Sequence, residues 1–206
     1  MAKPLVIVFA RAPRYGAVKT RLARDIGAAE ALRFYRGALR DLLRRVAHKA
    51  RWETILAVTP DRSSLDRTLW PSGIAITRQD GGDLGRRMIA ALRRAGARPA
   101  VLIGCDIPEL SADHVAAAFR ALGSRRFVLG PARDGGYWLI GARHPNHLKL
   151  SVLDGVRWSS AHTLQDSAAR LGDVAVLGAL LDDIDDGAAY SAFVRRTRLT
   201  RSCVAP

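Results

Sequence analysis

Leu5-Val6-Ile7-Val8-Phe9-Ala10 is an uninterrupted apolar run that ends at Arg11 and is followed by a basic segment. Its length suits a buried strand and is far short of the roughly 20 residues that cross a bilayer. The run also lacks the longer apolar core and the cleavage site of a signal peptide. Short runs of this kind recur and alternate with amphipathic segments, which is typical of β-α units around a mostly parallel sheet. The sequence therefore predicts an α/β fold, no membrane segment and a cytoplasmic location.

The other elements are predicted from the same two patterns. Residues 28–49 place apolar side chains such as Leu32, Leu39 and Val46 on one stripe of a helix, with arginines outside. Residues 84–94 and 113–122 show the same helical spacing, and further short strands are predicted at residues 54–58, 74–77, 100–103, 127–129, 137–140 and 175–177. The chain has 206 residues, of which 49% are hydrophobic. This suits one domain over residues 1–206, with a flexible tail after about residue 195.

The chain is strongly basic, with a formal net charge of +14 that would attract phosphate. Only four of its 33 basic residues are lysines, so a compositional bias toward arginine is an alternative source of the charge. The arginines are spread over several segments and form no aromatic-interleaved motif of a nucleic-acid-binding module. Cys105 and Cys203 are too few for a disulfide framework and lack metal-ligand spacing. The charge therefore supports an anionic ligand without identifying it, phosphate-bearing small molecules included, and the absence of a nucleic-acid-binding motif disfavours nucleic acid.

The segment after the first predicted strand, residues 10–22, contains Gly16 and the triplet Lys19-Thr20-Arg21. Backbone N–H groups, an ammonium and a guanidinium can together bind phosphate oxygens. In open α/β sheets ligands bind outside the carboxyl ends of the strands, where this segment is expected to lie. The segment lacks the glycine spacing of a Walker P-loop, so the chain is not a P-loop NTPase. A solvated basic turn is the alternative interpretation.

A glycine-rich segment, Gln79-Asp80-Gly81-Gly82-Asp83-Leu84-Gly85, leads into the second predicted helix. The glycines would let the backbone approach a flat ligand closely, and Asp83 could cap the helix. An ordinary junction between a loop and a helix is the alternative.

Carboxylates follow two of the predicted strands. Asp106 comes after the strand at residues 100–103, which Pro108 prevents from continuing. Asp183 and Asp185 lie among four aspartates and would point the same way in an extended segment. Clustered carboxylates repel one another unless a cation is near, and Mg²⁺ and Mn²⁺ prefer such oxygen ligands. We predict metal ligands at these positions, with turn capping by Asp106 and pairing with nearby arginines as the alternatives.

Two further segments could face a substrate. Asp134-Gly135-Gly136 lies between two apolar runs and precedes Tyr137, so it forms either a hairpin turn or a substrate-facing loop. Trp158 precedes a pair of serines at which a helix could start. Its indole either packs in the core or stacks on a ligand.

Taken in order, these segments resemble a family of transferases related to GT-A glycosyltransferases, of the radical-SAM/selenodomain-associated or arsenosugar-biosynthesis type. The resemblance extends from Val6 to about Phe193. Three positions depart from the family pattern, with Arg11 in place of lysine, Tyr15 in place of proline and Ser160 in place of threonine. The matching motifs are Ala12-Pro13 with Gly16 and Lys19-Thr20-Arg21-Leu22, Gly82-Asp83-Leu84-Gly85 with Arg87-Met88, Gly104 with Asp106 and Pro108, Gly130-Pro131 with Asp134-Gly135-Gly136-Tyr137, Trp158-Ser159, and Asp183-Ile184-Asp185.

The resemblance implies the nucleotide-diphospho-sugar transferase fold, a three-layer α/β/α sandwich also found in molybdenum-cofactor guanylyltransferase and phospholactate guanylyltransferase. It further implies sites for a nucleotide, a metal ion and a small-molecule acceptor. The implied nucleotide-binding residues are Ala10, Arg11, Gly16, Lys19, Thr20, Arg21, Gln79, Gly82, Asp83 and Gly85. The implied ligands of Mg²⁺ or Mn²⁺ are Asp106, Asp183 and Asp185, and the implied acceptor-binding residues are Asp134, Gly135, Gly136, Tyr137 and Trp158. Catalytic roles fall to Lys19, Asp106 and Asp134.

The sequence leaves two transfer reactions open. A glycosyltransferase would use a nucleoside-diphosphate sugar, with Lys19 and Arg21 neutralising the diphosphate and Asp134 orienting or deprotonating an acceptor hydroxyl. A nucleotidyltransferase would use the three metal-binding aspartates to join a nucleoside monophosphate to a small phosphorylated acceptor, with release of pyrophosphate. We favour the glycosyltransferase because of the family resemblance. A non-catalytic module that binds nucleotide or nucleic acid is a third alternative.

Overall fold

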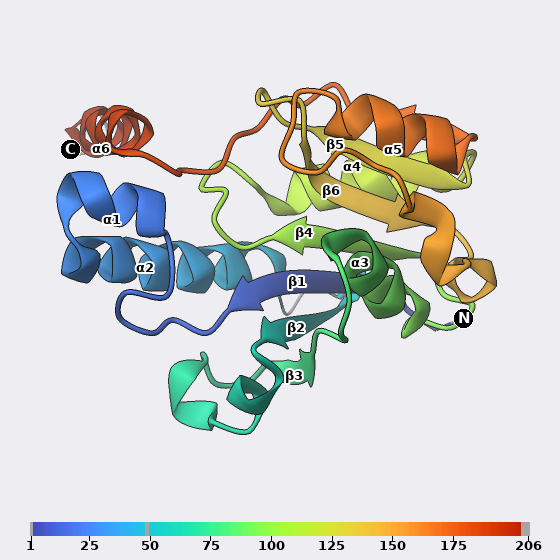
Figure 1. Ribbon diagram of the computed structural model, residues 1–206, viewed down its shortest axis with the longest axis horizontal. Coiled ribbons are helices and arrows are strands. Elements are labelled where there is room, and N and C mark those ends of the chain that lie inside the picture. Colours follow the sequence, from blue (N-terminus) through green and yellow to red (C-terminus); the bar gives the residue numbers. More distant parts are fainter. Residues whose placement is uncertain (1, 48–49, 203–206) are drawn as a thin grey trace.

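The computed structural model describes residues 2–47 and 50–202, and its centre is a seven-stranded sheet (Figure 1). The strand order is β3-β2-β1-β4-β6-β5-β7, and every neighbouring pair is parallel except the two pairs that involve β6. All seven predicted strands are present. They are β1 (Leu5–Arg11), β2 (Glu53–Thr59), β3 (Ala75–Arg78), β4 (Ala100–Gly104), β5 (Phe127–Pro131), β6 (Tyr137–Ala142) and β7 (Val174–Val176).

Six α-helices accompany the sheet within the described residues, and none of them has the length and apolar character needed to cross a membrane. The helices are α1 (Thr20–Ile26), α2 (Ala28–Val46), α3 (Leu84–Arg93), α4 (Ala112–Ala121), α5 (Thr163–Leu171) and α6 (Gly187–Ser202). The predictions of α2, α3 and α4 are confirmed, although residues 48–49 of the first predicted helix lie outside the described residues. The segment expected to be a flexible tail falls within α6 up to Ser202, and residues 203–206 are not described.

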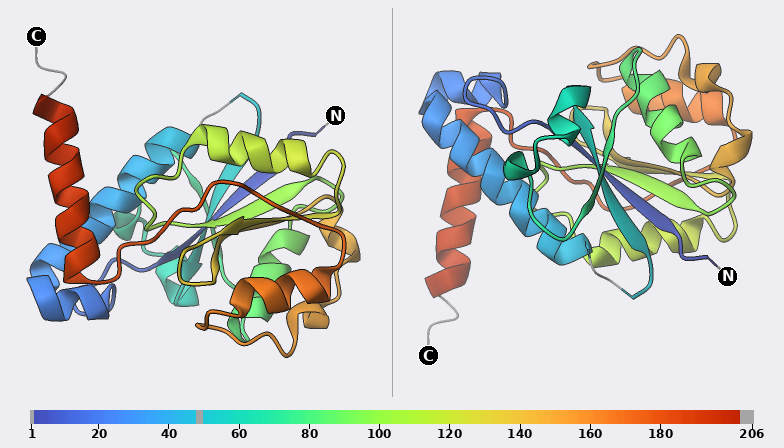
Figure 2. Two further views of the ribbon diagram at one scale, coloured as in Figure 1. Left: turned by 90° about the horizontal axis from the view of Figure 1, so that it is seen from above. Right: turned by 90° about the horizontal axis from the view of Figure 1, so that it is seen from below.

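Helices cover both faces of the sheet (Figure 2). Successive side chains of a strand point to opposite faces. Accordingly, Val6 and Val8 of β1 join the apolar core beneath α2 and α4, whereas Leu5 and Ile7 join the core beneath α3 and α5. The predicted three-layer α/β/α sandwich with a mostly parallel sheet is therefore confirmed.

The segment after β7 crosses the molecule to α6, which lies beside α1 on the far side (Figure 1). We call residues 177–186 of this segment the strap. A small third core fastens the end of the strap to the first two helices, and Phe34, Ile184, Tyr190 and Phe193 belong to it. The ring of Phe34 meets the rings of Tyr190 and Phe193 edge to face, with centroids 5.5 and 5.9 Å away. The strap thereby passes the edge of the sheet where β1 and β4 end.

Candidate active site

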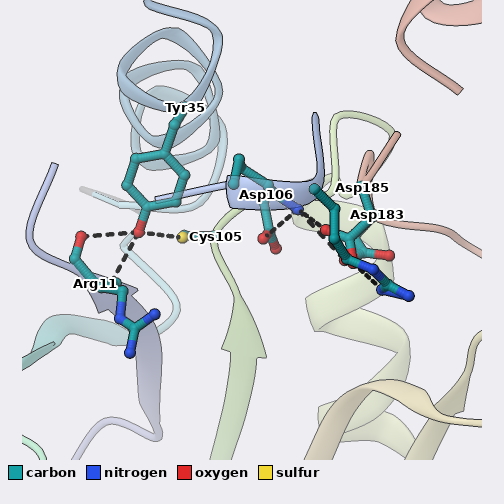
Figure 3. Close-up of polar contacts among 8 residues, drawn as sticks. Arg11, Tyr35, Cys105, Asp106, Asp183 and Asp185 are labelled. Carbon is teal, nitrogen blue, oxygen red and sulfur yellow. Dashed lines mark hydrogen bonds and ion pairs between the residues drawn. The ribbon is translucent and has the colours of Figure 1, made fainter. Parts of the chain in front are cut away.

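Three carboxylates meet at this edge of the sheet, and we call Asp106, Asp183 and Asp185 the Asp triad (Figure 3). Asp106 follows β4, whereas the other two come from the strap. One oxygen of each carboxylate lies within 4.8 Å of an oxygen of the others. The ammonium of Lys19 stands among them, 2.7 Å from Asp106 Oδ2, 2.6 Å from Asp185 Oδ1 and 3.4 Å from Asp183 Oδ2.

The backbone holds Lys19 in an uncommon conformation at the start of α1. Its φ of 47° and ψ of 49° are left-handed, which non-glycine residues adopt only at a cost in free energy. The side chain that this conformation directs toward the Asp triad is only 5% exposed. The conformation thus places a nearly buried cation at the centre of three carboxylates.

The charges in this cluster shift one another's pKa values. Burial alone would lower the pKa of Lys19, but Asp106 and Asp183 and the hydrogen bonds to Asp106 and Asp185 raise it above its ordinary value. Burial and repulsion from the other two carboxylates raise the pKa of Asp183, although Lys19 opposes this shift. Burial would also raise the pKa of Asp185, but hydrogen bonds from Lys19 and Arg21 hold it below its ordinary value. Lys19 therefore stays protonated and balances part of the negative charge.

The Asp triad has the donor chemistry of a site for a hard divalent cation. Mg²⁺ and Mn²⁺ take oxygen ligands and are commonly bound through carboxylates together with substrate phosphates. The ammonium occupies the position that such an ion would take, because it lies within hydrogen-bonding distance of all three carboxylates. The residues present therefore fit the predicted metal site.

A cavity of about 410 Å³, which we call the basic pocket, opens on one side of the triad. Four cationic side chains line it, namely Arg11, Lys19, Arg21 and Arg87. Of these, Lys19 and Arg21 pair with the triad, whereas Arg11 and Arg87 form no ion pair within the described residues. The pocket thus presents guanidinium groups that remain available to an anion.

Gln79 fixes one of these guanidinium groups. Its side chain is 3% exposed, and its amide nitrogen donates to the carbonyl oxygens of Ala10, at 3.2 Å, and Ala57, at 2.8 Å. Its amide oxygen accepts a hydrogen bond from Arg87. Both ends of the amide are therefore engaged by the protein, so Gln79 ties β1 to β2 and positions Arg87 at the wall of the basic pocket.

Tyr35 of α2 anchors the end of β1 from the other side (Figure 3). Its hydroxyl accepts from the backbone N–H of Arg11 at 2.8 Å and donates to the carbonyl oxygen of Arg11 at 2.9 Å. The thiol of Cys105 donates to the same hydroxyl at 3.2 Å. Burial raises the pKa of both Tyr35 and Cys105, so each stays protonated. These contacts connect the first strand to the residue that precedes Asp106.

A second cavity, which we call the aromatic pocket, has a volume of about 260 Å³. Tyr137, Trp138 and Trp158 line it, and Asp106 lines both this cavity and the basic pocket. Burial raises the pKa of Tyr137 to about 12, so its phenol is neutral at ordinary pH. The triad therefore stands at the boundary between a cationic cavity and a largely aromatic one.

The loop from β5 to β6 supplies another part of the aromatic pocket. It is a hairpin, as one of the two interpretations predicts, and Asp134 Oδ1 accepts from the backbone N–H of Gly136 at 2.8 Å. Asp134 and Gly136 also line the aromatic pocket, and the substrate-facing role of this loop stays a prediction. Gly135 instead packs beneath the next loop, because a Cβ atom there would lie 2.4 Å from the backbone of Ala161.

Some predicted nucleotide-binding residues lie away from the basic pocket. Gly16 is exposed and outside its lining, and Gly82 lines a separate surface cavity. Asp83 caps α3 by accepting from the backbone N–H of Arg86 at 2.8 Å, as the capping interpretation predicts. A Cβ atom on Gly85 would lie 2.7 Å from Trp158 Cζ2, so this glycine is needed for packing beside the aromatic pocket. The other predicted residues, Ala10, Arg11, Lys19, Thr20, Arg21 and Gln79, line the basic pocket together.

Several residues that line the two pockets carry little or no functional signal in the sequence. Tyr35 was hidden in the apolar stripe of α2, although a buried tyrosine hydroxyl requires a partner and could have drawn attention to it. Arg87 is recognisable in the sequence only as part of the motif Arg87-Met88. Ser159 has a left-handed backbone, with a φ of 54°, and lines the aromatic pocket with Thr163. Ser159 is part of the motif Trp158-Ser159, whereas no spacing rule in the sequence identifies Thr163.

Comparisons with known proteins show the family and the fold of the chain. A family model for uncharacterized proteins conserved in bacteria (DUF2064) matches residues 42–160, and the chain belongs to this family. A search of curated proteins finds none that matches the chain.

Solved structures establish the fold. The chain is similar to the crystal structure of a "putative nucleotide-diphospho-sugar transferase" from Desulfovibrio desulfuricans G20, with 26% identity, a TM-score of 0.81 and 98% of each chain covered. It also resembles Rv0371c of Mycobacterium tuberculosis H37Rv in complex with manganese, with 16% identity, a TM-score of 0.56, and 94% of this chain and 99% of that chain covered. A third similar structure is CMP:2-keto-3-deoxy-manno-octonic acid synthetase complexed with CTP, with 13% identity, a TM-score of 0.55, and 97% and 100% covered. The predicted nucleotide-diphospho-sugar transferase fold is therefore confirmed.

Proposed function

We propose that this member of the DUF2064 family is a metal-dependent glycosyltransferase that uses a nucleoside-diphosphate sugar. One observation carries the proposal, namely the division of charge between two cavities that meet at Asp106. The basic pocket, with four cationic side chains, suits the diphosphate of a donor. The aromatic pocket suits an acceptor, and a sugar at the boundary would lie beside both cavities.

Each cation of the basic pocket has a part in donor binding. Arg11 and Arg87 form no ion pair among the described residues, so binding phosphate breaks none. Lys19 and Arg21 exchange their contacts with the triad for contacts with phosphate oxygens. Gln79 and Tyr35 act through positioning, because their polar atoms are engaged by the protein.

The Asp triad would hold Mg²⁺ or Mn²⁺ through one oxygen of each carboxylate. When bound, such an ion supplies positive charge to the phosphate oxygens of the leaving nucleotide. Its neighbour Lys19 adds a second positive charge at the same place, where charge develops as the donor bond breaks. The matched Mycobacterium tuberculosis protein was solved with manganese, which supports a metal in this fold.

Asp134 would serve the acceptor. Its Oδ1 atom is held by the N–H of Gly136, which orients the carboxylate at the wall of the aromatic pocket. In the proposed reaction an acceptor hydroxyl oxygen bonds to the anomeric carbon of the sugar, while the bond from that carbon to the β-phosphate oxygen breaks. The hydroxyl proton passes to the carboxylate of Asp134.

The sequence motifs support a finer assignment of the protein to the radical-SAM/selenodomain-associated or arsenosugar-biosynthesis type of glycosyltransferase.

Nucleotidyl transfer is a second candidate, which the Asp triad and one of the matched structures favour. Three carboxylates can organise two metal ions around an α-phosphate. The synthetase solved with CTP shares the fold. Nucleotidyl transfer to a phosphorylated acceptor has less support, because no lysine or arginine of the described chain lines the aromatic pocket in which that acceptor would bind.

Product analysis separates the two reactions. The purified protein with Mn²⁺ is titrated calorimetrically with nucleoside-diphosphate sugars and nucleoside triphosphates, and the products of slow hydrolysis are then identified. Glycosyl transfer predicts binding of a nucleotide sugar and release of nucleoside diphosphate. Binding of triphosphates alone, with release of pyrophosphate, would replace the proposal with nucleotidyl transfer.

Two variants with the same chemical change serve as test and control. Asp106→Asn removes a triad carboxylate that lines both pockets and should abolish metal-dependent turnover, with an unchanged circular dichroism spectrum. Asp113→Asn alters an exposed residue of α4 and should leave turnover unchanged. Full activity of Asp106→Asn would show that this residue is not needed to hold the metal.

A further inference from the structure

We propose that the aromatic pocket selects an uncharged hydroxyl compound with a flat apolar face and rejects anionic acceptors. This inference rests on the proposed function, in which that pocket holds the acceptor. It goes further by assigning the chemical class of the second substrate.

The charge of the lining is the first argument. Among the described residues, the pocket is lined by three carboxylates, Asp106, Asp134 and Asp183, and by no lysine, arginine or histidine. This is notable in a chain with a net charge of +14. Even with two of these carboxylates bound to a metal ion, Asp134 remains as a negative charge without a cationic partner in the lining. Away from the metal site and Lys19 at its boundary, a phosphate or carboxylate in this cavity would meet no cationic side chain of the described chain and would be repelled by Asp134.

Two arginines of the loops that line the pocket, Arg133 and Arg157, are paired with carboxylates outside it. Arg133, beside Asp134, has its Nε atom 2.7 Å from Asp182 Oδ2, and its backbone N–H also donates to Asp182. Arg157, beside Trp158, donates to Asp166 from its Nε and from a terminal nitrogen, both at 2.8 Å. Turning either guanidinium toward the pocket would break these contacts. The pocket therefore does not acquire a cation from its own loops without loss of existing ion pairs.

The remaining walls suit a flat apolar face. Leu84 and Met88 of α3 lie in the lining with Tyr137 and Trp158, whose rings are 6.5 Å apart at an angle of 69°. Aromatic rings in such walls commonly stack against flat ligands. Within the described chain, Asp134 Oδ2 has no hydrogen-bond partner, so it is available to accept from a ligand hydroxyl. A cavity of about 260 Å³ with these walls fits a small ring that carries a hydroxyl.

Met88 provides a direct probe of this pocket. The chain contains only two methionines, Met1 and Met88, so ¹³C-methyl labelling of methionine gives two signals. Met88 is buried in the wall of the aromatic pocket, and its methyl signal should report occupancy. The labelled full chain is titrated in Mg²⁺ buffer at neutral pH with 2-phenylethanol and with phenylacetate. These probes have similar size and the same ring and differ in charge.

We expect 2-phenylethanol to shift the Met88 signal with a dissociation constant at least tenfold lower than that of phenylacetate. Asp134→Asn keeps an oxygen that can accept from Gly136, and it should narrow this ratio severalfold by removing the repulsive charge. Asp113→Asn, on the exposed face of α4, should leave the ratio unchanged. Equal or tighter binding of phenylacetate would overturn the inference, as would the absence of a Met88 response to both probes.

The titration also separates this inference from the proposed function. Binding of nucleoside diphosphates is measured by calorimetry on the same samples and depends on the basic pocket. If no nucleotide binds while the Met88 response follows the expected order, the nucleotide-dependent function fails and the selectivity of the pocket stands. If nucleotide binds and phenylacetate is preferred, the inference fails and a phosphorylated acceptor becomes the better hypothesis.

Discussion

Lys19→Ala should move metal affinity and nucleotide affinity in opposite directions. In the structure the ammonium occupies the position among the triad carboxylates that a divalent ion would take, at 2.6 and 2.7 Å from two of them. Metal binding to the wild-type protein must therefore displace Lys19. The alanine variant removes this competitor and leaves Asp106 and Asp183 without an ion pair in the described part of the chain, while Arg21 still pairs with Asp185. Manganese should bind it more tightly in the absence of nucleotide.

The structure sets the size of the effect. A hydrogen bond to a charged group contributes about 1.5–3 kcal/mol, and Lys19 makes two short ones. Asp183 and Asp185 are 43% and 42% exposed, so water screens part of this interaction. We therefore take a value near the lower end, about 2 kcal/mol, which corresponds to about a thirtyfold gain in affinity for Mn²⁺. With metal present, the loss of the same ammonium should weaken binding of a nucleoside diphosphate by about 1.5–3 kcal/mol.

Electron paramagnetic resonance of free Mn²⁺ measures the first effect, and calorimetry with nucleoside diphosphates measures the second. Lys149→Ala is the matched control, because Lys149 is exposed and lies outside both pockets. An Mn²⁺ affinity in Lys19→Ala equal to or lower than that of the wild type would refute the reasoning. It would show that the ammonium and the metal do not compete for the triad.

Three further predictions concern residues around the two pockets. Tyr35→Phe should lower the free energy of unfolding by about 1–3 kcal/mol, because it leaves the backbone N–H of Arg11 without its partner. Urea unfolding measures this change. An unchanged free energy of unfolding would mean that water replaces the hydroxyl. Gly85→Ala should lower the free energy of unfolding by about 1–3 kcal/mol and shift the Met88 methyl signal, because the new Cβ atom would lie 2.7 Å from Trp158. A variant with wild-type stability and spectrum would contradict the tight packing. In a Cys203→Ser background, Cys105 should react with iodoacetamide at least ~100-fold more slowly in the native protein than in urea, because burial raises its thiol pKa and blocks access. Equal rates in the two states would show that the thiol is accessible.

The strands were predictable because their signal is local. Each buried strand, such as β1, is a short apolar run, and burial on both faces removes any need for alternation with polar residues. The helices α2, α3 and α4 carry a clear apolar stripe, because each packs one side against the core. The helix α1 has only seven residues and buries Leu22 alone, so its pattern is too weak to separate it from the basic loop. Lys19 was expected in that loop and proves to be the N-cap residue that directly precedes this helix.

The candidate site was predictable in its residue types but less so in its contacts. Asp106 and Asp183 were predictable as metal ligands because carboxylates that follow strands gather at one edge of a parallel sheet. That Lys19 would sit among them depends on where the strap passes, which no local spacing specifies. The orientation of the Gln79 side chain could not be predicted from the sequence either, because its amide donates hydrogen bonds to carbonyl groups of two other strands. Sequence patterns thus located the edge of the site, and long-range packing decided which side chains face a ligand.

The geometry of the Asp triad depends on residues far from any ligand. The strap is fixed near its middle by Arg133, which pairs with Asp182 at 2.7 Å, and just after its end by Asp25, which accepts from the backbone N–H of Gly187 at 2.7 Å. Between these two points Ile184 is buried in the small core beneath α6, so Asp183 and Asp185 on either side of it are turned outward toward Lys19. A metal site needs its ligands held within a few tenths of an ångström, which exposed loops seldom achieve without such support. The terminal helix therefore belongs to the machinery of the site, because it supplies the apolar contacts that keep two of the three carboxylates in place.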